Sequence, residues 1–291
     1  MIRQKFYADW TVEKGDGNSR MNSFLGNTQT QTVHLPYDAM IHDARTPDTK
    51  NGAQTGFYPG GEYIFQKHFT APQAWQGKPV SLVFEGVYQT ALVYLNGWLL
   101  TRNVNGYAEF TVEADPYLKY GADNLLKVIA DNSLEPNSRW YTGSGIYRPV
   151  RLLVGNKVYL PQDTVRITTR EVGEGFALVD VTAQVQSASA VTERVTLQQT
   201  ICREGMAVLT DRQNLLLQPG ESRIVSFRYC VDSPALWSPE NPNLYTSTMQ
   251  VLEGEEELDR EETSFGIRTL SIDASHRERH HGQTVKQRGA C

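Results

Sequence analysis

The stretch Ala91-Leu-Val-Tyr-Leu95-Asn96-Gly97-Trp98-Leu-Leu100 places an Asn-Gly pair between two apolar runs. A two-residue type I′ turn needs positive φ at both central positions, and Asn followed by Gly adopts these angles readily. Apolar runs on either side of such a pair are typical of paired strands. The stretch therefore predicts a β-hairpin with its turn at Asn96-Gly97.

Strand patterns continue on both sides of this predicted hairpin. Leu82 and Phe84 occupy alternate positions before it, and a strand places such residues on one face. Two more runs follow, at Tyr107–Val112 and Leu125–Ala130. Turn residues interrupt the chain roughly every 8–12 residues and long stretches of helical period are missing, which favours a β-sandwich or a jelly roll.

A second group of strands follows a change of composition across Lys157–Asp163. Its most regular runs are Leu178–Val185, Val195–Ile201, Ile224–Val231 and Tyr245–Leu252. About seven strands in about 115 residues are typical of an immunoglobulin-like sandwich. We predict an all-β chain with domains at residues 1–157 and 158–272. The remaining residues, 273–291, have no apolar face, and we expect this tail to be loosely attached.

Composition excludes several classes of protein. The 291 residues carry a net charge of −5 and no basic stripe interleaved with aromatic residues, which argues against nucleic-acid binding. No apolar run reaches the roughly 18 residues of a membrane-spanning helix, so we expect no membrane association. The first residues, Met1–Trp10, lack the apolar run of a signal peptide. A cytoplasmic protein is the resulting expectation.

The cysteine and histidine patterns predict neither a metal site nor a cofactor. The three cysteines, Cys202, Cys230 and Cys291, are odd in number and form no C-x-x-C motif. Cys202 and Cys230 fall on strands of one predicted domain, so a disulfide between them stays open, but two buried free thiols are favoured. The six histidines lack H-E-x-x-H spacing. The acidic run Glu253–Glu257 is expected to close a hairpin in solvent rather than to bind a metal.

Arg139–Arg148 reads R-W-Y-T-G-S-G-I-Y-R, and it is the most informative stretch for function. Glycines allow tight turns, and arginines present planar hydrogen-bonding groups, so a shaped loop is expected here. This stretch resembles the end of the N-terminal sugar-binding domain of family 2 glycoside hydrolases. Other segments match the family in order: Phe6–Trp10, Val33–Asp38, Phe84–Val87, Val93–Gly97, Gly106-Tyr107, Asn124–Val128, Asp131-Asn132, Leu236–Tyr245 and Phe265–Arg268.

The resemblance implies a galactose-binding-like jelly roll, an immunoglobulin-like sandwich and then a catalytic TIM barrel, which this chain would stop short of. Retaining hydrolysis uses two carboxyl groups roughly 5–5.5 Å apart. In the family both are glutamates on the barrel, so no catalytic residue is expected here and the chain alone is predicted to be inactive. The carboxylates of the first domain are scattered, and nothing in the sequence forces two of them together: Glu62, Glu85, Asp115, Asp131 and Glu135.

Two loops are candidates for contact with a sugar. The glycine-rich segment Asn51–Gly61 offers Phe57 and Tyr58 for stacking on a sugar ring, although a plain surface loop explains it as well. The second loop offers Asn137, Ser138, Arg139 and Trp140. Some family β-galactosidases place a sugar-contacting aspartate two residues before the tryptophan, and Ser138 occupies that position here. Arg139 and Arg148 are interpreted chiefly as structural, Trp140 and Tyr141 as interface packing, and Tyr147 as a core residue.

The leading interpretation is the non-catalytic N-terminal part of a β-galactosidase, with a β-glycoside as substrate and a TIM barrel as partner. A β-glucuronidase is the alternative within the same family. A stand-alone carbohydrate-binding module and a purely structural module that supports oligomer contacts are alternatives from other classes. Family contacts vary, so a homo-oligomer stays open.

Overall fold

The computed structural model describes residues 1–15, 30–134, 138, 140–272, 278–280 and 283–284. The chain divides into two compact units, one formed by residues 2–154 and the other by residues 155–291 together with Met1. Both units are built from β-strands, which confirms the predicted all-β class. Each unit has its own buried apolar cluster.

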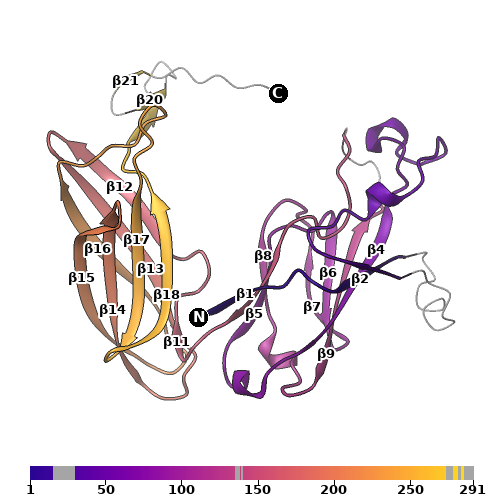
Figure 1. Ribbon diagram of the computed structural model, residues 1–291, viewed down its shortest axis with the longest axis horizontal. Helices are drawn as coiled ribbons and strands as arrows, with labels where there is room; N and C mark the ends of the chain where they lie inside the picture. The colour runs from indigo at the N-terminus through magenta and orange to yellow at the C-terminus, as the bar shows by residue number, and fades with distance from the viewer. Residues whose placement is uncertain (16–29, 135–137, 139, 273–277, 281–282, 285–291) are drawn as a thin grey trace. The chain divides into compact units, whose positions relative to one another are not determined.

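Among the described residues of the first unit there are ten strands and four short 3-10 turns. The strands are β1 (Ile2–Lys5), β2 (Trp10–Lys14), β3 (Gln31–Val33), β4 (Gly61–Thr70), β5 (Val80–Phe84), β6 (Thr90–Leu95), β7 (Trp98–Asn103), β8 (Phe110–Glu113), β9 (Asp123–Asn132) and β10 (Val150–Val154). The 3-10 turns are η1 (Met40–His42), η2 (Gly52–Thr55), η3 (Gln73–Trp75) and η4 (Asp115–Tyr117). Figure 1 shows these elements in indigo to magenta.

Two antiparallel sheets pack around the core of the first unit. The larger sheet has the order β3-β2-β4-β9-β6-β7, and the smaller has the order β1-β10-β5-β8. Leu82 and Phe84 of the smaller sheet and Val93, Leu95 and Leu126 of the larger one are fully buried in a single cluster. In neither sheet does the spatial order of the strands follow their order in the sequence, as the predicted jelly roll requires.

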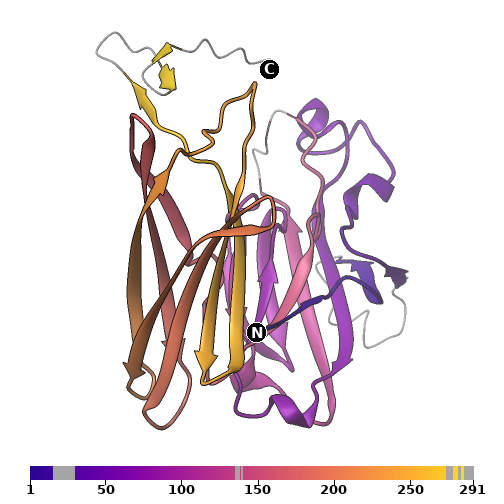
Figure 2. The same cartoon turned by 60° about the vertical axis from the view of Figure 1, so that its left-hand side comes forward.

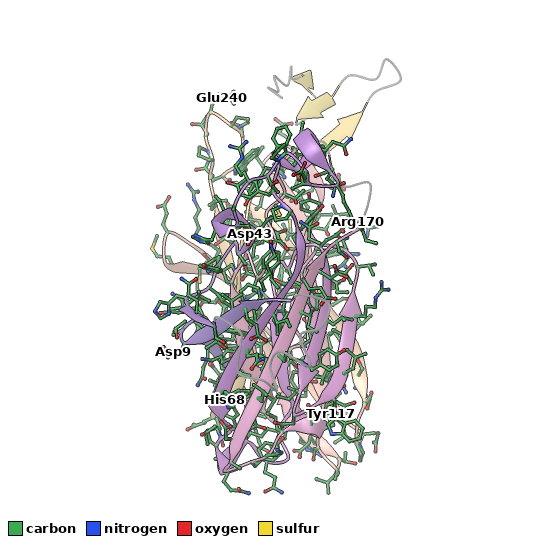
Figure 3. All side chains as sticks on the ribbon, turned by 90° about the vertical axis from the view of Figure 1, so that its right-hand side faces the viewer. Asp9, Asp43, His68, Tyr117, Arg170 and Glu240 are labelled. Carbon is green, nitrogen blue, oxygen red and sulfur yellow. The ribbon has the colours of Figure 1, made fainter. Side chains whose placement is uncertain are left out.

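The predicted hairpin is confirmed as β6–β7. Asn96 has φ of 52° and Gly97 has φ of 90°, the two positive angles that a type I′ turn needs. The side-chain amide of Asn96 donates to the carbonyl oxygen of Tyr117 at 2.8 Å. Figure 3 places Tyr117 and His68 toward one end of this unit and Asp43 toward the other. The hairpin turn thus lies at the end opposite to the loops around Asp43.

The second unit is a two-layer sandwich. Its strands are β11 (Val158–Tyr159), β12 (Arg166–Gly173), β13 (Phe176–Ser187), β14 (Glu193–Arg203), β15 (Met206–Leu217), β16 (Ser222–Asp232), β17 (Tyr245–Glu253) and β18 (Glu256–Phe265). One sheet joins β11, β12 and β16 to β13, and the other has the order β15-β14-β17-β18. Beyond one end of the sandwich lies a small sheet of β19 (Leu270–Ile272), β20 (Glu278–His280) and β21 (Gln283–Thr284) (Figures 1 and 2).

The alternation predicted in this unit is present in the structure. Val179, Val181 and Val185 of β13 are fully buried, and Phe227 and Val231 of β16 face the same core. The acidic run closes the β17–β18 hairpin, as expected, with Glu253 opposite Glu256. The tail was expected to be loosely attached, yet two of its segments form β20 and β21.

The prediction that both thiols are buried is wrong, most clearly for Cys230. Cys202 and Cys230 are free, but Cys202 is half-buried and Cys230 is exposed. The reason is the two-residue period of β16, which directs Tyr229 and Val231 into the core and Cys230 to solvent. Cys291 lies outside the described residues.

Candidate functional site

Two segments that the sequence analysis singled out lie side by side in the first unit. Tyr37 donates its backbone N–H to the carbonyl of Ile146 at 2.8 Å, and Ala39 donates to the carbonyl of Ser144 at 2.8 Å. The Val33–Asp38 segment therefore pairs with the Arg139–Arg148 segment, more than 100 residues later in the chain. The pairing fixes the backbone of both loops through main-chain hydrogen bonds.

Asp38 holds this pairing together through its side chain. Its Oδ1 accepts the N–H groups of Met40 at 3.1 Å and Ser144 at 2.9 Å. Its Oδ2 accepts the phenol O–H of Tyr141 at 2.5 Å. Burial, and then the hydrogen bond to Asp38, raise the pKa of Tyr141 above its ordinary value. The phenol is thus kept in its neutral, donating form, and hydrogen bonds to a charged acceptor are among the stronger ones in proteins.

Two glycines allow the segments to approach so closely. A Cβ at Gly143, which has φ of 70°, would lie 2.9 Å from the Asp38 carboxylate. A Cβ at Gly145, which has φ of 137°, would lie 2.7 Å from the carbonyl oxygen of Tyr37 and 2.9 Å from Phe65. Only glycine fits both the angle and the space at these two positions.

The predicted Asn51–Gly61 loop packs against the same segment. The rings of Tyr58 and Tyr141 are 5.1 Å apart at an angle of 60°. The guanidinium of Arg45 lies 5.6 Å from the centre of the Tyr58 ring, and its Nε donates to the carbonyl of Gly56 at 2.9 Å. Tyr58 is consequently half-buried between Arg45 and Tyr141, so only part of its ring is open to a ligand.

Phe57 lies on the outer side of this loop. Its backbone has φ of 66° and its side chain is exposed. Together with Arg45, Thr46 and Pro47 it lines a shallow hollow of about 390 Å³. An exposed aromatic ring in such a hollow can pack on the apolar face of a polar ring, as sugars have.

Ser138 and Trp140 stand at the start of the second loop. The hydroxyl of Ser138 donates to the carbonyl of Trp140 at 2.8 Å, and the Trp140 side chain is 62% exposed. Asn137 and Arg139 lie outside the described residues. The structure thus presents Trp140 as an open ring on a turn that Ser138 supports.

A second tyrosine pair adjoins this turn. The rings of Tyr88 and Tyr107 are 5.3 Å apart. Burial, and then the Tyr107 phenol, raise the pKa of Tyr88, whereas hydrogen bonds with Thr142 and Ser138 act in the opposite direction. Tyr88 therefore connects Ser138 to the exposed Tyr107, a residue that the sequence analysis noted only as part of a family segment.

Together these contacts define an aromatic loop end, formed by Phe57, Tyr58, Tyr88, Tyr107, Trp140 and Tyr141. Figure 1 shows the loops that carry η1 and η2 at the same end of the first unit. Sequence reasoning missed Asp38 and Tyr88, the residues that join the loops. The position of Asp38 at the end of the Leu-Pro-containing segment was the only available signal.

The carboxylate of Asp43 holds the loop after η1 in place beside the aromatic loop end. The Oδ2 of Asp43 accepts from Lys14 at 2.6 Å and from the Tyr63 phenol at 2.5 Å. Burial, and then the hydrogen bond to Asp43, raise the pKa of Tyr63. Tyr63 belongs to β4, so this contact ties the η1 loop to the larger sheet.

Two sequence expectations about side chains are wrong. Glu62 and Asp131 are not scattered, because they stand directly opposite each other on β4 and β9. Asp131 accepts the backbone N–H of Ser133 at 2.9 Å, which gives it a structural role at the end of β9. Tyr147 is half-buried rather than in the core. Its phenol donates to the Gly106 carbonyl at 2.7 Å, and Ile146 is the buried residue.

No cluster of three or more potential metal ligands occurs among the residues that the structure describes. Within the same residues, no helix is long and apolar enough to cross a membrane.

Comparisons with known proteins cover nearly the whole chain. The sequence model for the galactose-binding domain-like part of glycosyl hydrolase 2 matches residues 10–168. The model for glycosyl hydrolases family 2 matches residues 158–268. A β-galactosidase of Bacteroides ovatus is 32% identical over 99% of this chain and 34% of its own length. A putative β-glucuronidase of Formosa agariphila is 30% identical over 100% of this chain and 27% of its own length.

A solved structure gives the same picture. A family 2 glycosyl hydrolase from Bacteroides cellulosilyticus superposes with a TM-score of 0.89 and 29% identity, over 98% of this chain and 38% of that one. The chain therefore spans about a third of the length of these relatives and corresponds to their N-terminal part.

Proposed function

Because the chain belongs to glycosyl hydrolase family 2, we propose that it is the non-catalytic N-terminal part of a retaining β-galactosidase. In this proposal the hydrolytic glutamates are supplied by a catalytic TIM barrel that follows in the longer relatives. The chain by itself is then inactive. Its contribution is to shape one side of the sugar pocket.

The observation that supports this role is the aromatic loop end. Asp38 ties two loops that are distant in sequence, and the result is a preformed set of rings with Trp140 and Phe57 open to solvent. Preformed sites bind more tightly because little ordering is left to be done on binding. We propose that Phe57, Tyr58, Ser138 and Trp140 contact the substrate; the same contact stays a prediction for Asn137 and Arg139, which lie outside the described residues.

The test uses a fusion in which this chain replaces the aligned N-terminal region of the Bacteroides ovatus β-galactosidase. The chain alone is expected to give no turnover of an aryl β-galactoside, whereas the fusion hydrolyses it. Trp140→Ala in the fusion is expected to lower kcat/KM about tenfold, equivalent to about 1.4 kcal/mol. Trp98→Ala is the matched control, because Trp98 is 66% exposed but follows the hairpin turn at the opposite end.

Two results would overturn the proposal. Turnover by the chain alone would point to the Glu62–Asp131 pair. Loss of this turnover in Glu62→Gln would establish that these carboxylates carry out hydrolysis. Equal kcat/KM values for Trp140→Ala, Trp98→Ala and the unmodified fusion would remove the aromatic loop end from the substrate pocket.

A β-glucuronidase is the second candidate. The similarity to the Formosa agariphila relative extends over the whole chain, so the N-terminal part alone does not favour galactosides strongly. Measuring aryl β-glucuronide and aryl β-galactoside side by side on the full-length parent enzyme decides between them. Sugar affinity of the isolated chain, with no effect on any barrel, would instead favour a stand-alone carbohydrate-binding module.

A further inference from the structure

A row of four polar side chains crosses the outer face of one sheet in the second unit. The sheet has the order β15-β14-β17-β18, so β15 and β18 are its two outermost strands (Figure 1). Arg212 of β15 donates from Nε to Oε1 of Gln198 in β14 at 2.6 Å. Nε2 of Gln198 donates to Oε1 of Gln250 in β17 at 2.8 Å, and Nε2 of Gln250 donates to Oε2 of Glu257 in β18 at 2.5 Å. We call these four residues the glutamine ladder.

Strand register brings the members of the glutamine ladder together. Gln198 lies directly opposite Arg212 on one side and Gln250 on the other. The residues beside the two glutamines, Leu197 and Val251, are fully buried in the core. Because neighbouring side chains of a strand point to opposite faces, both glutamines point away from the core. Both are half-buried, whereas the two charged ends of the ladder are exposed.

The charges at the two ends determine how both amides are oriented. A guanidinium has donors only, so Arg212 requires the side-chain oxygen of Gln198 to face it. A carboxylate has acceptors only, so Glu257 requires the side-chain nitrogen of Gln250. The two amides then meet with the nitrogen of Gln198 facing the oxygen of Gln250. Reversing one amide alone would bring two oxygens or two N–H groups face to face.

The two ends are coupled through the amides rather than directly. Within the part of the chain that the structure describes, neither the Arg212 guanidinium nor the Glu257 carboxylate forms an ion pair. Neighbouring strands are about 4.8 Å apart, so three strand spacings separate the ends by on the order of 14 Å. Salt at physiological concentration screens exposed charges beyond about 8 Å. Direct attraction between the ends is therefore small.

We propose that the glutamine ladder is a two-state conformational relay, in which the charges of Arg212 and Glu257 together set the orientation of both amides. In one state both amide oxygens point toward β15, as in the structure, and in the other both point toward β18. A given pair of end charges is fully hydrogen-bonded in only one of these states. A charged ligand that takes up either end group therefore changes the hydrogen bonding at the opposite edge of the sheet.

The experiment reverses the end charges singly and together in this chain and measures the urea unfolding of the second unit. Arg212→Glu and Glu257→Arg are each expected to lower the folding equilibrium constant about threefold, which is typical of exposed charged pairs. Independent effects would combine to a loss of about ninefold. The double variant is expected to lose only about twofold, because both amides can turn over and satisfy the reversed ends.

Control variants separate relay through the amides from attraction through space. Gln250→Leu interrupts the ladder and leaves both charged ends in place, so the two reversals are expected to act independently in this background. Gln198→Leu interrupts it from the other side and is expected to give the same result. A double variant that recovers stability despite either interruption would overturn the relay. So would a ninefold loss for the double variant when both glutamines are present.

Nuclear magnetic resonance of the glutamine side-chain amides gives a second, direct readout. Glu257→Arg is expected to shift the side-chain amide signals of Gln198, although Gln198 bonds to Gln250 and Arg212 and not to Glu257. Glu256→Arg is the matched control, because Glu256 is the adjacent exposed residue outside the ladder, and it is expected to leave these signals in place. Signals of Gln198 that stay unmoved in Glu257→Arg would overturn the relay.

Discussion

At the scale of single residues, Gly145 is the position of the aromatic loop end that has least room for a side chain. Two features disfavour a side chain at this position. The backbone has φ of 137°, and a Cβ would lie 2.7 Å from the Tyr37 carbonyl oxygen. Gly145→Ala is expected to lower the free energy of unfolding by about 2–4 kcal/mol, because backbone strain and overpacking add. Urea unfolding followed by circular dichroism measures the change.

Gly52→Ala is the matched control for this prediction. Gly52 also has a positive φ, of 52°, but a Cβ there would meet nothing within 4 Å. Only the backbone preference is then altered, and a loss of about 1 kcal/mol is expected. Equal losses for the two variants would mean that close packing at Gly145 contributes nothing.

Tyr141 predicts a specific response to alkaline pH. Its pKa is raised above the ordinary 10.0 by burial and by Asp38, so the folded chain binds this proton more tightly than the unfolded chain. The stabilisation is complete below pH 10 and is lost as pH rises from there toward the folded-state pKa. Tyr141→Phe is expected to flatten the decline in stability between about pH 10 and 12, measured as urea midpoints. An unchanged slope would contradict the assignment.

At the scale of elements, the β6–β7 hairpin depends on one side chain, Asn96. Its amide donates to Tyr117 and to the Asn124 side chain, both at 2.8 Å, and its oxygen accepts the N–H of Leu125 at 3.1 Å. Asn96→Ala removes these bonds at a residue with positive φ and takes away one of the two donors to the side-chain oxygen of buried Asn124. The expected loss is about 2–3 kcal/mol of unfolding free energy. Asn105→Ala, on an exposed turn, is the control and is expected to change stability by less than about 1 kcal/mol.

The strands and turns of the two units show how much of the fold can be predicted from local sequence patterns. The β6–β7 turn and the alternation in β13 and β16 were predictable because period and turn chemistry are local signals. β15 was missed, since it is an edge strand whose side chains are mostly exposed and whose apolar residues do not alternate. β18 was missed because its sequence, Glu256–Phe265, is largely charged.

Long-range contacts at the site were beyond such signals. Sequence patterns identified both the Asn51–Gly61 loop and the Arg139–Arg148 loop, but the bond from Tyr141 to Asp38 spans 103 residues. The opposition of Glu62 and Asp131 likewise depends on strand register across β4 and β9. Neither the register of two strands nor a hydrogen bond between residues so far apart can be predicted from composition or from the period of apolar residues.

At the scale of the whole molecule, the two buried clusters share no residue. One extends from Phe6 to Val154 and the other from Val158 to Ile267. A unit of about 150 residues buries enough surface to fold by itself. We therefore predict that residues 1–157, expressed separately, unfold in one cooperative step in urea. The midpoint is expected to match that of a transition in the full chain within an equivalent of about 1 kcal/mol.

Gly145→Ala should lower this midpoint in the fragment as it does in the full chain, while Leu244→Asp in the full chain should leave that transition in place. A fragment without a cooperative transition would show that the first sandwich needs the second to fold, and the division at residue 157 would then be wrong.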